Sequence, residues 1–263
     1  MFLRELKINF KSFLIWMSVL LGLMLVVFLV YPSIMNSENI KLMDEYMKMF
    51  PEEMLVAFNM DISSIDTAYG WLKTEGFVLL LLIMGCYSGI LGSQILLKEE
   101  NDKTIEYLNS LPITRRKIVF SKAFSGVFYI VIMVLLLGIF NYIGLTLTEE
   151  FDHTQYLLLS LTPLFSSISI YFLCFFLSAF THKTKKMLGV SLGISFASYL
   201  FHTLSTISEE VEFLKYFSVF TLADTRNVIL EVSINPIMIL ITIGVSFLFF
   251  LLALVRYQKK ELI

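Results

Sequence analysis

The feature that most constrains this chain is a set of six long stretches that contain no Asp, Glu, Lys or Arg residue. A bilayer core of about 30 Å is crossed by roughly 20 apolar helical residues, because in lipid every backbone N–H and C=O must be bonded within the segment. The sequence therefore predicts an all-α membrane protein with one transmembrane domain over 1–263. We expect its six transmembrane helices at 13–31, 76–97, 123–147, 156–180, 187–206 and 236–255.

Composition supports this class. The chain is 57% hydrophobic and 16% charged, whereas soluble domains carry roughly 25% charged residues. Both cysteines, Cys86 and Cys174, fall inside apolar stretches and so form no extracellular disulfide framework. We expect neither a separate aqueous domain nor a nucleic-acid partner.

Charged residues are distributed unevenly over the two sides of the membrane. With six spans both termini share one side, which carries 15 of the 20 Lys and Arg residues and 6 of the 22 Asp and Glu residues. The other side carries 5 basic and 16 acidic residues. Because an excess of basic residues marks the cytosolic side, we expect a multi-pass plasma-membrane protein with both termini in the cytosol.

Three segments outside the spans have patterns of their own. Apolar residues recur at helical spacing over 2–10 with basic residues between them, which predicts an amphipathic elbow helix at the membrane surface. The acidic segment 32–75 is expected to be an extracellular helical insertion. The aromatic-rich segment 207–235 is expected to pack on, or dip into, the outer leaflet.

Catalytic and metal-binding patterns are missing from the sequence. The chain has no Gly-x-x-x-x-Gly-Lys-Ser/Thr phosphate loop and no His-Glu-x-x-His pair. These are the common patterns of ATP hydrolysis and of zinc-dependent proteolysis. We therefore expect no ATPase or hydrolase activity, no catalytic residue and no metal site in this chain.

An intramembrane serine enzyme is a weaker alternative. Residues 189–193 match Gly-x-Ser-x-Gly, but that pattern needs a strand and a sharp turn. Ser191 and His202 are eleven residues apart, or about 16 Å along a helix. We interpret the Gly-x-x-x-Gly pairs in 85–89 and 189–193 as small-residue helix packing.

The connection between the second and third spans carries the most information. Acidic residues at 99, 100 and 102 favour a helix start, an apolar stripe follows, and Pro112 ends the helix. Thr114 can cap the next helix. The pattern predicts a short helix over 99–111, and taken alone it is also compatible with a surface helix that only connects two spans.

This connection resembles the signature of the membrane subunits of ABC type-2 exporters. The matching residues are Glu99-Glu100, Thr104-Ile105-Glu106-Tyr107-Leu108, Ser110-Leu111-Pro112-Ile113-Thr114-Arg115 and Ser121-Lys122. In that family the segment reads approximately Glu-Glu, then Gly-Thr-Leu-Glu-x-Leu-Leu-Ser-x-Pro-Val-Ser-Arg, and then Lys before the third span. The match covers about 25 residues, and Lys103 replaces the usual Gly, which leaves the local turn open.

The resemblance implies that the 99–111 helix is a coupling helix that docks on a separate ABC ATPase subunit. Residues implied in this contact are Glu99, Glu100, Thr104, Glu106, Leu108, Leu111, Pro112 and Arg115. The second inner loop, over 181–186, is a weaker contact candidate. The resemblance also implies ATP and Mg on the ATPase, no cofactor in this chain, and a second permease subunit as a homodimer or a paralogous heterodimer.

The transport pathway is expected to be lined by uncharged polar side chains. Candidates are Tyr87, Ser88, Ser93, Gln94, Asn141, Ser195, Tyr199 and His202. Such a lining suits a hydrophobic or amphipathic cargo, and the peptide-exporting and antimicrobial-peptide immunity members of the bacterial family make peptides the first choice, ahead of drugs or lipids. The alternative function is a membrane sensor or assembly module that binds a partner through its acidic outer segment.

Overall fold

The computed structural model describes residues 1–34, 49, 67–110, 112–207, 209–223 and 233–260. Most of the predicted outer insertion over 32–75 therefore lies outside the described residues, as does Leu111. Among the described residues the structure is helical and contains no strand.

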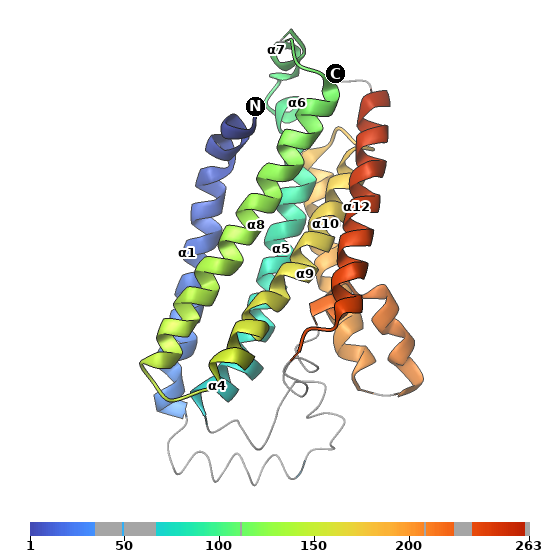
Figure 1. The fold of residues 1–263 in the computed structure, drawn as a ribbon. Helices are drawn as coiled ribbons and strands as arrows, with labels where there is room; N and C mark the ends of the chain where they lie inside the picture. Colours follow the sequence, from blue (N-terminus) through green and yellow to red (C-terminus); the bar gives the residue numbers. More distant parts are fainter. Residues whose placement is uncertain (35–48, 50–66, 111, 208, 224–232, 261–263) are drawn as a thin grey trace.

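Six membrane-length helices form an elongated bundle with both termini at the same end (Figure 1). We call this the terminal end and the other the opposite end. The long helices are α1 (Phe2–Ile34), α5 (Phe77–Ile95), α8 (Arg115–Thr146), α9 (His153–Ser178), α10 (Thr184–Ser205) and α12 (Pro236–Lys259). The six-span prediction is confirmed.

The shorter helices lie at the two ends. At the terminal end, α6 (Lys98–Asn101) and α7 (Ile105–Ser110) connect α5 to α8. At the opposite end, the 3-10 helices η2 (Glu209–Phe217) and η3 (Phe220–Ala223) follow α10. Phe213, Tyr216 and Phe217 are exposed there, and the prediction that this segment enters the outer leaflet stays a prediction.

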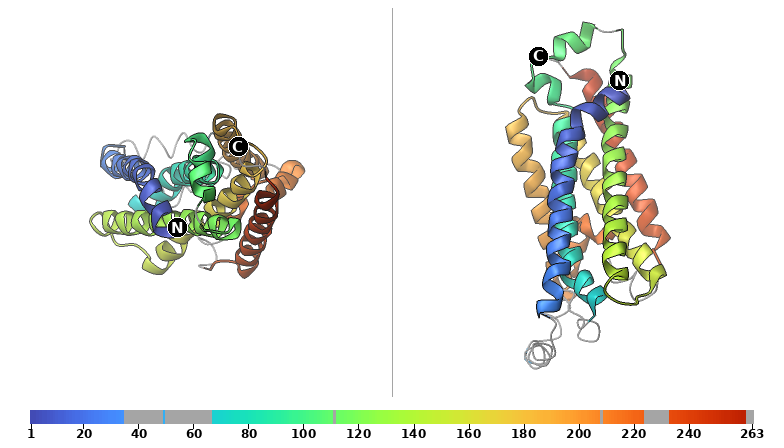
Figure 2. Two further views of the ribbon diagram at one scale, coloured as in Figure 1. Left: turned by 90° about the horizontal axis from the view of Figure 1, so that it is seen from above. Right: turned by 90° about the vertical axis from the view of Figure 1, so that its left-hand side faces the viewer.

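The first and second spans differ from the sequence expectation. The predicted elbow and first span form one continuous helix, whose first turns lean away from the rest (Figure 2). The second span begins at Ala68 rather than near 76, because α4 (Ala68–Trp71) and a π-helical turn, η1 (Leu72–Gly76), continue directly into α5. Thr67 caps this helix by accepting from the Gly70 backbone N–H.

The centre of the bundle is the contact of α5 with α9 and α10. A Cβ on Gly92 would lie 2.3 Å from the Tyr171 carbonyl oxygen, so α5 and α9 approach each other at backbone distance. A Cβ on Gly89 would lie 3.3 Å from Ser191 of α10, which confirms the packing interpretation for 85–89. Gly189 and Gly193 have nothing within 4 Å in the described chain, so there the interpretation is not supported within one copy.

Candidate functional site: a buried ionic cluster under the α6–α7 loop

The loop between α5 and α8 is two short helices, whereas the sequence predicted one helix over 99–111. The break falls at Lys103, which has a φ of 55°. Thr104 N–H donates to the Glu99 carbonyl at 2.8 Å, as in the left-handed caps that end helices. Lys103 stands where the related family has glycine, so this chain keeps the turn with a lysine in a conformation that costs roughly 1–2 kcal/mol.

Lys122, near the start of α8, is the centre of the buried charges. Its Nζ lies 2.6 Å from Glu99 Oε2 of α6 and 3.2 Å from Glu5 Oε2 of α1. It also donates to the Ile95 carbonyl at 2.7 Å. An ammonium group has three donors, so these contacts use all of them. All three charged side chains are almost completely buried, which ties α1, α6 and α8 together.

Glu100 makes the second set of contacts. Its Oε1 lies 2.8 Å from Lys260 Nζ, and its Oε2 lies 2.6 Å from His182 Nδ1. Lys260 Nζ also donates to the Thr181 carbonyl at 2.6 Å. Burial lowers the pKa of the Lys260 ammonium, and the Glu100 carboxylate acts in the opposite direction. These contacts tie α6 to the α9–α10 connection and to the residue that follows α12.

We call Glu5, Glu99, Glu100, Lys122, His182 and Lys260 together the ionic cluster. Two further basic side chains, those of Lys98 and Arg115, bind backbone carbonyls next to the cluster. Lys98 Nζ donates to the Ile8 carbonyl at 3.2 Å, and burial lowers its pKa. Arg115 donates to the carbonyls of Gln258 and Lys260 at 3.1 and 2.8 Å. The α6–α7 loop is thereby bound to both terminal segments of the chain.

The structure separates the predicted ATPase-contact residues into two groups. Glu99 and Glu100 have their carboxylates inside the ionic cluster, and Leu108 is fully buried in the hydrophobic core. Arg115 is half-buried against the end of α12. The exposed members are Thr104, Glu106 and Pro112, joined on the same loop by Asp102 and Lys103, which the sequence analysis did not select.

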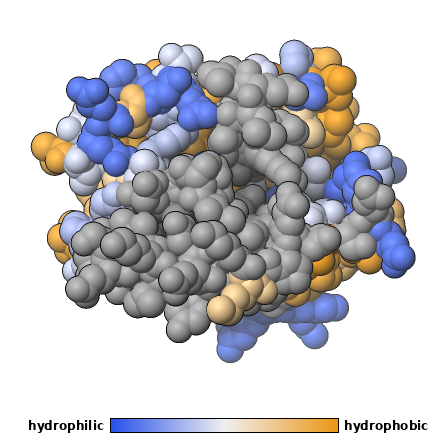
Figure 3. All heavy atoms as spheres, turned by 90° about the horizontal axis from the view of Figure 1, so that it is seen from below, coloured by the Kyte–Doolittle hydropathy of each residue, from blue (hydrophilic) through white to orange (hydrophobic). Residues whose placement is uncertain are grey.

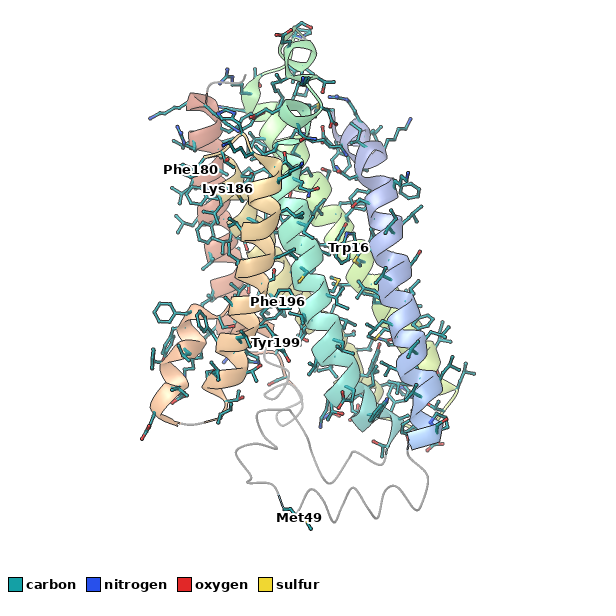
Figure 4. All side chains as sticks on the ribbon, turned by 180° about the vertical axis from the view of Figure 1, so that it is seen from behind. Trp16, Met49, Phe180, Lys186, Phe196 and Tyr199 are labelled. Carbon is teal, nitrogen blue, oxygen red and sulfur yellow. The ribbon has the colours of Figure 1, made fainter. Side chains whose placement is uncertain are left out.

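The predicted pathway residues lie in separate places. Tyr87 faces Trp16 of α1, with ring centroids 5.9 Å apart. Figure 4 labels Trp16 on α1 and Tyr199 on α10. Ser93 and Ser195 pack α5 against α10, where Ser195 Oγ donates to the Gly85 carbonyl at 3.1 Å. Asn141 lies on α8 against α9. Of the others, Ser88 is buried, and Gln94, Tyr199 and His202 are half-buried. Their role as a pathway stays a prediction.

Sequence reasoning missed Glu5, His182 and Lys260 as members of a shared cluster, and used Lys122 only as part of a family resemblance. Two local signals exist. Glu5 is the one acid among the basic residues before the first apolar stretch, and Lys122 directly precedes the third. A charge at the edge of a span, where the helix is packed by neighbours, has to find a partner because burial of an unpaired charge is costly.

These observations define a multi-pass helical membrane protein whose loop between the second and third spans is fixed by buried ion pairs. A family model described as ABC-2 family transporter protein matches residues 2–262. The chain therefore belongs to the ABC-2 transporter family, as a membrane permease component. No curated protein and no solved structure matches the chain.

Proposed function

We propose that the chain is the permease subunit of an ATP-driven exporter and that the exposed side of the α6–α7 loop docks on a separate ATPase. Membership of the ABC-2 transporter family supports the assignment of the chain as a permease subunit. The observation that carries the docking assignment is the loop itself. It presents Asp102, Lys103, Thr104 and Glu106 to solvent while its other side is anchored in the ionic cluster. A partner that pushes on this loop therefore pushes on α1, α8, the end of α12 and the α9–α10 connection.

The transmission follows from these contacts. Glu99 connects the loop to α1 and α8, and Glu100 connects it to the end of α12 and the α9–α10 connection. ATP and Mg act on the partner ATPase, whose closure would move the loop. Binding of the ATPase can shift the equilibrium between two states of the permease only by as much as the affinity of the ATPase differs between those states. A catalytic group in this chain is not required.

The complete transporter contains a second permease copy or a paralogue. Support comes from α10, where Gly189 and Gly193 are exposed and have nothing within 4 Å. Small residues on a membrane helix allow a second helix to approach closely. The excess of basic residues at the terminal end supports a cytosolic position for both termini.

We assign hydrophobic or amphipathic peptides as the cargo class. Away from the ionic cluster, the buried polar side chains between the spans include uncharged hydroxyls and amides such as Ser93, Asn141 and Ser195. They give hydrogen bonds without the desolvation cost of a full charge. Such surroundings suit an amphipathic chain better than a small ion.

The docking assignment is tested by reversing charge on the exposed loop. In Lys103→Glu with Glu106→Arg, both changed side chains are exposed, so membrane insertion should be normal. Co-purification of the ATPase should fall at least tenfold. Lys11→Glu reverses an exposed charge on α1 and is the matched control. Unchanged co-purification of the double variant would show that docking occurs elsewhere, and reproducible absence of any ATPase from the native chain would favour the sensor or assembly module.

A further inference from the structure

A groove runs between α8 and α9 in the half of the bundle nearest the opposite end. It has a volume of about 550 Å³, within the roughly 300–1,000 Å³ typical of ligand sites. Its walls are Leu135 and Ile139 of α8 and Leu157 and Leu161 of α9, and its floor includes Gly138 and Ser160. A Cβ on Gly138 would touch Ser160 Cβ at 3.5 Å, so the small residues leave the groove open.

The groove opens to the outside of the bundle. Leu135, Ile139 and Leu157 are 50%, 57% and 56% exposed. All three belong to membrane-length helices, so in a single copy their exposed sides would contact lipid. An apolar groove left unfilled would lose the dispersion contacts of its walls. Its natural occupant is therefore an apolar chain that arrives laterally from the bilayer.

Aromatic rings close the groove toward the opposite end. Tyr142 and Tyr156 line it and have ring centroids 5.8 Å apart. The ring centroid of Phe151 lies 5.6 Å from that of Tyr142, and the ring centroid of His153 lies 4.8 Å from that of Phe151. A cation over such rings gains about 0.5–1 kcal/mol at an exposed site. The groove thus ends where a headgroup amine would sit.

Charge at this end also favours a headgroup that contains an amine over one whose only charge is the phosphate anion. The connection from α8 to α9 contains Glu149, Glu150 and Asp152 and no Lys or Arg. Glu150 is exposed, while Glu149 accepts from the Tyr69 backbone N–H and Asp152 caps α9. Figure 3, which looks onto the opposite end, shows hydrophilic side chains in separate groups beside hydrophobic ones. Glu150 is thus the carboxylate of this connection that is left to solvent, and it directly precedes Phe151 in the sequence.

The inner end of the groove meets a cavity of about 10 Å³, with Val134, Gly138 and Tyr156 common to both. Asn141, only 1% exposed, lines this cavity, and its Oδ1 has no hydrogen-bond partner among the described residues. A volume of this size holds about one water molecule. An apolar chain therefore stays in the groove and does not continue into the bundle.

We propose that the α8–α9 groove binds one acyl chain of an outer-leaflet phospholipid whose amine headgroup lies over the Tyr142 and Phe151 rings near Glu150. The choice of the outer leaflet depends on the orientation given under Proposed function, in which both termini are cytosolic. The binding itself does not require the ATPase. The lipid class is an aminophospholipid such as phosphatidylethanolamine, in preference to an anionic phosphatidylglycerol.

The test uses the full chain in nanodiscs of phosphatidylethanolamine and phosphatidylglycerol, with a trace of either lipid carrying a photoactivatable acyl chain. The amine lipid should label peptides from 134–142 and 156–161 several-fold more than those from α12, and about two- to fivefold more than the anionic probe does. Gly138→Leu, which fills the floor, should remove the excess labelling. Gly244→Leu, at an α12 glycine with nothing within 4 Å, should leave it unchanged.

Glu150→Gln distinguishes the contribution of the headgroup from that of the acyl chain. It should reduce the difference in labelling between the amine lipid and the anionic lipid, and it should leave labelling by the acyl chain in place. Equal labelling of α8, α9 and α12 would overturn the proposal and indicate ordinary surrounding lipid. Efficient disulfide formation between two copies of Ile139→Cys would also overturn it, because the groove would then be a contact between copies. Neither result bears on ATPase docking, which the loop variants test separately.

Discussion

The terminal end and the middle of the bundle are held together by different interactions. At the terminal end, Lys122 and Lys260 bind carboxylates from segments far apart in the sequence. In the middle, α5 meets α9 at backbone distance around Gly92 and Tyr171. The ion pairs join the loop to several segments at once, whereas close packing fixes the distance between two helices. The difference indicates that a force on the loop reaches several spans, which themselves pack as units.

The largest effect should come from removing the centre of the ionic cluster. Lys122→Met leaves Glu5 buried without an ion-pair partner among the described residues and leaves Glu99 with Arg4 alone, at 3.9 Å. Breaking a buried pair in this way costs about 3–5 kcal/mol. The free energy of unfolding in detergent micelles should fall by that amount. Combining Lys122→Met with Glu5→Gln and Glu99→Gln should recover much of it. If Lys122→Met alone were as stable as the native chain, the cluster would not hold the terminal end.

A smaller loss should follow from adding one methyl group in the middle of the bundle. Gly92→Ala would place Cβ 2.3 Å from the Tyr171 carbonyl, and overpacking of this kind costs about 1–3 kcal/mol. Gly244→Ala on α12 has nothing within 4 Å and is the matched control. Thermal unfolding of the two variants in the same micelles measures the difference. Equal stabilities would mean that α5 and α9 are not in backbone contact.

The smallest effect should be a gain. Lys103→Gly relieves the left-handed backbone at φ 55°, and after allowing for the greater freedom of glycine in the unfolded chain the gain is about 0.5–1 kcal/mol. Lys103→Ala keeps the strain and should give no gain. Hydrogen exchange at the Thr104 amide, which bonds to Glu99, reports the local stability. Slower exchange in both variants, or in neither, would contradict the assignment of strain to this residue.

Much of the fold was predictable from the sequence because the lipid core imposes a length on every apolar stretch. The loop at 98–114 was also located correctly, since its charges and Pro112 interrupt the apolar pattern. The inward orientation of the Glu99 and Glu100 carboxylates, into the ionic cluster, was not predictable. Acids at a helix start are usually solvated, and the partners of Glu99 and Glu100, which are Lys122, His182 and Lys260, are distant in the sequence. The candidate pathway residues stay a prediction, because an uncharged stretch shows which residues are polar but not which neighbour they face.

The most direct test of the central claim is site-specific cross-linking from the exposed turn of the loop. Cys86 and Cys174 are buried, so a single Lys103→Cys can carry a short heterobifunctional cross-linker in native membranes. The predicted result is one major product that contains an ABC ATPase, with little or none from Lys11→Cys on α1. Equal yields from both positions, or a Lys103→Cys product without an ATPase, would contradict the docking of this loop on an ATPase subunit.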